Sequence, residues 1–85
     1  MAVYVDALID WGWKLGPSCH MAADSDEELH TFAASIGLKR YWVQTHAKYR
    51  LHYDLTASRR KLAIKLGAIE LSFSEFIKKL RSNKI

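Results

Sequence analysis

The segment 51–61, Leu-His-Tyr-Asp-Leu-Thr-Ala-Ser-Arg-Arg-Lys, holds the side chains of this sequence that are best suited to chemistry. A histidine, a phenol and a carboxylate come directly before a helix that we expect to begin at about Thr56 and to open with three cations. Helix N-termini present unpaired backbone N–H groups and a partial positive charge, so anions bind there readily. A phosphate- or nucleic-acid-binding accessory protein would use this site. We predict that the anion-binding residues are Arg59, Arg60, His52, Tyr53 and Gln44.

Acid–base catalysis is an alternative use of the same region. An imidazole beside a carboxylate can transfer protons during the cleavage of a phosphoester, while neighbouring arginines hold the phosphate. The protein would then be a small hydrolase or transferase acting on a phosphoester or a nucleotide, and its status as an enzyme stays open. The catalytic residues of this alternative are His52, Asp54, His20 and Asp24.

Metal binding would draw on the same residue types, because neutral imidazole and carboxylate are ordinary ligands for zinc or manganese. The sequence has no tight ligand spacing such as HExxH or paired CxxC motifs. We therefore predict no metal ligands, and the residues do not point to a particular cofactor. The single cysteine, Cys19, excludes an internal disulfide and fits a reducing cytosol.

A third hypothesis is a protein-interaction module that blocks a host protein. The loop expected at residues 10–17 contains Trp11 and Trp13, and two exposed tryptophans would suit a protein contact. A basic helix near the C-terminus could serve the same purpose. Its cations are Lys78, Lys79, Arg81 and Lys84.

Charge and composition limit the partners. The net charge is +4 and the pI about 9.4, which favours a nucleic acid, a nucleotide or an acidic protein. Residues 1–30 are acidic and residues 39–84 are basic, and ten large aromatic rings are many for so small a core, so we expect a homodimer. The start of the chain is not a signal peptide, and no apolar run is long enough for a membrane span. We expect a cytoplasmic protein without a membrane partner.

The pattern of apolar residues predicts one small α/β domain over residues 1–85, with element order β-β-α-β-α-β-α. We expect a single-layer, partly parallel sheet with three helices. The predicted strands cover residues 3–9, 18–23, 39–46 and 68–71. The predicted helices begin near Ser25, Thr56 and Ser72, and the first and third open with a Ser-x-x-Glu capping box. In such folds ligands bind at the carboxyl ends of parallel strands. That rule would gather Asp6, Asp24, Gln44, His46 and residues 52–54 at one edge.

Several of these residues also form a pattern across most of residues 3–71. The pattern consists of Tyr4-Val5-Asp6, His20-Met21 with Asp24, Glu28-Leu29-His30, Ile36-Gly37, Trp42 with Gln44, His52-Tyr53-Asp54, Arg60 and Gly67-Ala68. In this respect the chain resembles a family of small bacterial and phage proteins known as domain of unknown function 4031. The resemblance implies a phage or prophage origin and implies that the polar residues at the strand ends belong to the family pattern, but it implies no activity.

Overall fold

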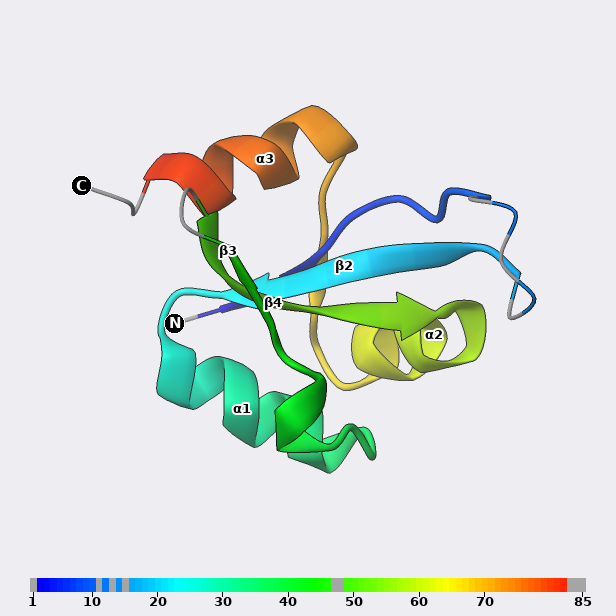
Figure 1. The fold of residues 1–85 in the computed structure, drawn as a ribbon, viewed down its shortest axis with the longest axis horizontal. Helices are drawn as coiled ribbons and strands as arrows, with labels where there is room; N and C mark the ends of the chain where they lie inside the picture. The colour runs from blue at the N-terminus through cyan, green and yellow to red at the C-terminus, as the bar shows by residue number, and fades with distance from the viewer. Residues whose placement is uncertain (1, 11, 13, 15, 47–48, 83–85) are drawn as a thin grey trace.

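A five-stranded sheet lies between two layers of helices in the computed structural model, which describes residues 2–10, 12, 14, 16–46 and 49–82. Helices α1 and α2 cover one face of the sheet, and α3 lies on the other face (Figure 1). The elements, in chain order, are β1 (Val3–Val5), β2 (Ser18–Ala23), α1 (Asp26–Ser35), the 3-10 turn η1 (Arg40–Trp42), β3 (Gln44–His46), β4 (Tyr49–Thr56), α2 (Ala57–Lys65), β5 (Ile69–Glu70) and α3 (Phe73–Ser82). The predicted α/β class with three helices is confirmed.

The sheet is mixed, with strand order β3-β4-β2-β1-β5. Within the described residues only β1 and β5 pair in parallel, and the other three pairings are antiparallel. Since β2 runs against both β1 and β4, the carboxyl ends of β1, β4 and β5 lie at one edge of the sheet, beside the first residues of β2. The carboxyl end of β2 lies at the opposite edge.

The middle of the chain differs from the sequence prediction. Residues 39–46 do not form one strand, because Arg40–Trp42 forms a 3-10 turn and only Gln44–His46 is extended. A further strand, β4, covers Tyr49–Thr56 and at eight residues is the longest of the described strands. The segment His52-Tyr53-Asp54 is therefore part of a strand and not a loop ahead of a helix.

The alternation of apolar and polar residues explains β4. Leu51, Tyr53 and Leu55 alternate with polar neighbours, and this period of two is typical of a strand. Tyr53 and Leu55 are buried in the main core between the sheet and helices α1 and α2. The alternation places His52 and Asp54 on the opposite face, which α3 covers in part.

Helix α3 buries a smaller second core. Its Phe76 and Leu80 pack on Tyr4 and Ala22 of the neighbouring strands β1 and β2. Asp6 comes two residues after Tyr4, directly after β1, and His20 comes two residues before Ala22 on β2. Because side chains alternate along a strand, Asp6 and His20 lie on the same face of the sheet as this core. The polar side chains of Asp6 and His20 therefore border the small core.

Local signals place the helix ends as predicted. Ser25 Oγ accepts a hydrogen bond from Glu28 N, and Thr56 Oγ1 accepts one from Arg59 N. Gly37 follows α1 with a φ of 82°, a left-handed conformation that glycine adopts without strain. In the described part of the chain no helix is both long and apolar enough to cross a membrane.

Candidate functional site

The centre of the candidate site is a buried carboxylate paired with a histidine. Asp6 follows β1 directly and is 0% exposed. The antiparallel register of β1 and β2 places it opposite His20, whose backbone N–H donates to Asp6 Oδ1 at 2.6 Å. Asp6 Oδ2 lies 2.9 Å from His20 Nδ1. Both oxygens of the buried carboxylate are therefore hydrogen-bonded, and both bonds go to one residue.

This pairing sets the ionisation and the orientation of the imidazole. The hydrogen bond to Asp6 raises the pKa of His20 above its ordinary value, against the opposing effect of partial burial. With Nδ1 held by Asp6, the other ring nitrogen, Nε2, lies 3.8 Å from Asp54 Oδ1. The His20 side chain is 28% exposed, so a proton can be exchanged at Nε2 with a bound molecule or with water.

Two residues of β4 complete the group, which we call the His20 cluster: Asp6, His20, His52 and Asp54. Asp54 is directly opposite His20 in the register of β2 and β4. His52 lies two positions earlier on the same face, with its ring centroid 5.7 Å from that of His20. Phe76 of α3 borders the cluster, with its ring centroid 6.1 Å from that of His20. Two imidazoles and two carboxylates thus meet at the edge of the apolar face of α3.

Arg60 holds the strand ends around the cluster. Its Nε donates to the backbone oxygen of Asp6 at 2.9 Å, and its Nη2 donates to Glu70 Oε1 at 3.1 Å. These two bonds connect α2 to the carboxyl ends of β1 and β5. The main contribution of Arg60 in this structure is to fix the backbone that carries Asp6.

Arg59 makes a different set of contacts. Its Nη1 donates to the backbone oxygens of Ile36 and Gly37, at 3.3 and 2.9 Å, and so satisfies carbonyls at the end of α1. Its guanidinium also lies 5.9 Å from the ring centroid of Trp42. Beside these residues is a pocket of about 400 Å³ at the start of α2. Its lining consists of Leu38, Trp42, Asp54, Thr56, Ser58 and Arg59.

Other residues predicted for the site lie elsewhere. Tyr53 is buried on the α1 face of the sheet, where its hydroxyl lies 2.7 Å from His30 Nδ1. Asp24 lies at the far end of β2 and accepts hydrogen bonds from the Tyr4 hydroxyl and from Ala2 N. The bond from Tyr4 lowers the pKa of Asp24. Gln44, in contrast, lies beside the His20 cluster, because it is opposite His52 in the register of β3 and β4.

The structure thus brings three of the four candidate catalytic residues together, namely His20, His52 and Asp54, and separates Asp24 from them. It also adds Asp6, which the sequence placed at a strand end but not among the site residues. A charged residue directly after the apolar run Val3-Tyr4-Val5 was the available signal. The two loop tryptophans, Trp11 and Trp13, and the side chain of His46 lie outside the described residues.

Neither a metal centre nor a reactive thiol emerges from the described residues. Among them, no group of three or more His, Cys, Asp or Glu side chains is arranged to hold a metal ion. Cys19 is buried, and burial raises the pKa of its thiol to about 12, so the reactive thiolate is scarce at neutral pH.

The fold and the site define a small mixed α/β protein with a partly exposed histidine–carboxylate cluster on its sheet. A family model described as a protein of unknown function, DUF4031, matches residues 3–83. The chain belongs to this family, which confirms the predicted resemblance. No curated protein and no solved structure is significantly similar to it.

Proposed function

We propose that the protein is a small hydrolase or transferase that cleaves a phosphoester bond and uses His20 as its central acid–base group. The observation that carries this proposal is the hydrogen bond between the buried carboxylate of Asp6 and His20 Nδ1. A carboxylate in this position fixes the tautomer and the ring orientation, so that Nε2 accepts and returns the proton.

The roles follow from the geometry of the cluster. His20 Nε2 takes the proton of an attacking water or hydroxyl as the new P–O bond forms. The imidazolium of His52 gives a proton to the leaving oxygen as the old P–O bond breaks. Asp6 positions His20, and Asp54, 3.8 Å from Nε2, stabilises the imidazolium that forms. The return of a proton from His20 to His52 through water completes the cycle.

Charge supports a phosphoester as the substrate class. Residues 39–84 hold twelve of the thirteen cations of the chain against three acidic residues. Helix α2, which follows β4 directly, has no acidic residue in its first turn to neutralise its N-terminal dipole. A nucleotide or a nucleic acid is the partner that this balance favours.

Hydrolysis of bis(p-nitrophenyl) phosphate and of a short RNA oligonucleotide tests the proposal. We expect His20→Gln to lower kcat/KM by roughly a hundredfold to ten-thousandfold, the usual contribution of a general acid–base group. The matched control is His30→Gln, because His30 pairs with Tyr53 on the other face of the sheet and should leave the rate unchanged. Absence of turnover with both substrates, or equal rates for His20→Gln and the wild type, would refute an enzymatic role.

The pocket at the start of α2 favours a second candidate, a phosphate- or nucleic-acid-binding accessory protein without catalysis. Trp42 is 42% exposed and offers a ring on which a base can stack, beside the guanidinium of Arg59 and the hydroxyls of Thr56 and Ser58. Arg59 is already held in place by its bonds to the end of α1, which reduces the entropy lost on binding.

Fluorescence titration with AMP and with a dT10 oligonucleotide tests this candidate. Affinity should fall steeply between 50 and about 200 mM salt if phosphate contacts dominate binding. Arg59→Gln should weaken binding. Lys65→Gln is the control, because it removes one positive charge from the last turn of the same helix, outside the pocket, and should leave the affinity unchanged. Binding that persists at high salt, or that is equal in both variants, would rule out this site.

A further inference from the structure

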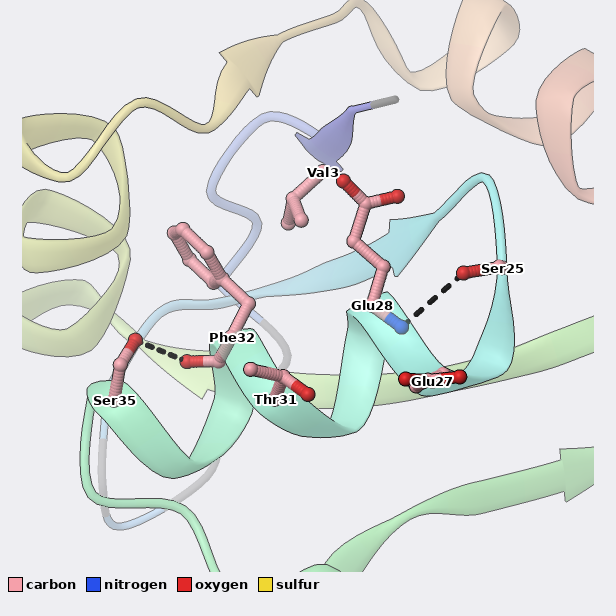
Figure 2. A pocket seen from close by; sticks show the side chains of 7 residues that line it. All are labelled: Val3, Ser25, Glu27, Glu28, Thr31, Phe32 and Ser35. Carbon is pink, nitrogen blue, oxygen red and sulfur yellow. Dashed lines mark hydrogen bonds between the residues drawn. The ribbon is translucent and has the colours of Figure 1, made fainter.

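A second and larger pocket lies on the other side of the sheet from the His20 cluster. It has a volume of about 520 Å³ and is formed by α1 and the first residue of β1 (Figure 2). Val3 and Phe32 give it an apolar wall, and Thr31 and Ser35 lie along the same side of α1. Glu27 and Glu28 supply its charge. Its volume falls within the range typical of small-molecule sites.

Glu28 is the unusual residue of this pocket. Its Oε1 atom is shielded from solvent and has no hydrogen-bond partner among the described residues. Figure 2 shows its carboxylate turned toward Val3 and away from Ser25, although the Glu28 backbone N–H still donates to Ser25 Oγ. A buried carboxylate oxygen without a partner is costly, so native structures rarely contain one.

The capping box at the start of α3 differs from the one that contains Glu28. At the start of α3, Ser72 N donates to Glu75 Oε1 at 2.9 Å, and Glu75 N donates to Ser72 Oγ at 3.2 Å. Both halves of that capping box are formed. At the start of α1 the same Ser-x-x-Glu pattern forms only the half that uses the serine side chain, within the described hydrogen bonds. The carboxylate of Glu28 is left available to the pocket.

We infer that this pocket binds an organic cation, a primary ammonium carried on an apolar chain. The ammonium supplies the donor and the positive charge that Glu28 lacks, and the chain covers Val3 and Phe32. The last bond of a glutamate side chain turns freely, so rotation of the carboxylate brings Oε1 to the bound group. Asp26, Glu27 and Glu28 form the first turn of α1, which strengthens the preference for a cation. The inference is independent of the proposed acid–base function.

Titration of the labelled protein with hexylammonium chloride and with 1-hexanol, followed by amide NMR shifts, tests the inference. We expect hexylammonium to bind at least about tenfold more tightly than hexanol, because a charge-assisted hydrogen bond distinguishes the two probes. Glu28→Gln should bring the two affinities within about twofold of each other while binding of hexanol persists. Asp26→Asn removes the same charge two residues earlier in the same helical turn, outside the lining, and should keep the preference.

Equal binding of the two probes to the wild type would overturn the inference, as would the absence of shifts at Val3 and Phe32. Sedimentation velocity measures self-association, and so distinguishes two possible occupants of the pocket: a free amine and a lysine side chain of a second copy of the protein. If the wild type self-associates through Glu28 and hexylammonium does not bind, the occupant is the basic face of another α3 and the small-cation site is refuted.

Discussion

Asp6, which is buried, and Glu28, which has one oxygen shielded from solvent, lie on opposite faces of one sheet, and the hydrogen bonding of their carboxylates differs. Both oxygens of Asp6 are hydrogen-bonded to His20. Glu28 has a buried oxygen without a partner among the described residues. A satisfied buried carboxylate stabilises the fold through its partners, whereas an unsatisfied one costs free energy until a ligand arrives. The comparison thus distinguishes the carboxylate of Asp6, which stabilises the structure, from that of Glu28, for which we infer a role in binding a ligand.

The largest expected effect is at Asp6. Asp6→Ala should lower the free energy of unfolding by about 3 kcal/mol, because it leaves the His20 backbone N–H unpaired beside a small cavity. Asp6→Asn, which keeps the volume and one acceptor, should cost less. Urea unfolding followed by tryptophan fluorescence measures both. The control is Asp10→Ala at an exposed loop position, and equal losses at Asp6 and Asp10 would mean that the buried pair contributes nothing.

The pH dependence of stability should reveal the same pair. Because the pKa of His20 is raised on folding, its contribution is fully present below the unfolded value of about 6.5 and is lost as the pH rises through the folded pKa. The free energy of unfolding of the wild type should therefore fall as the pH rises above about 6.5. His20→Gln should abolish this fall. Urea titrations across this range provide the measurement. Parallel pH profiles for the two proteins would show that the pair is not coupled to folding.

Glu28 should respond in the opposite direction from Asp6. Glu28→Gln replaces the carboxylate whose shielded Oε1 has no partner among the described residues and keeps the shape, so it should raise the free energy of unfolding by about 1 kcal/mol. Such a gain corresponds to a Tm increase of roughly 4–8 °C in a domain of this size. Differential scanning calorimetry measures the change. A loss of stability would mean that Glu28 has a native partner and that the comparison with Asp6 fails.

An effect of similar size and opposite sign is expected at the serines of the capping boxes. Ser25→Ala and Ser72→Ala should each cost about 1 kcal/mol, since each serine accepts a hydrogen bond from the backbone N–H three residues on. Glu75→Gln should lower the Tm slightly, because the bonds from Ser72 hold the pKa of Glu75 below its usual range. A rise at Glu28 and a fall at Glu75 would confirm that the two boxes differ.

Three of the four residues of the His20 cluster can be predicted from the sequence. His20, His52 and Asp54 are recognisable by residue type, and the pattern after them predicts a helix from Thr56 onward. Their grouping with Asp6 could not be derived, because it depends on the antiparallel register of β1 with β2 and of β2 with β4. Asp24 was included wrongly in the spatial group, since the assumption of parallel strands put its strand end at the wrong edge.

Three features can be predicted from the chain alone: where the helices begin, the α/β class and the family. Capping boxes and apolar stripes act over three to seven residues, so they can be recognised in the chain alone. Two further features follow from the tertiary structure alone: the pairing of Asp6 with His20, and the departure of the Glu28 carboxylate from its capping box. Each of these depends on strand pairing or on packing between residues distant in the chain, such as Val3 against α1, and no local pattern encodes it.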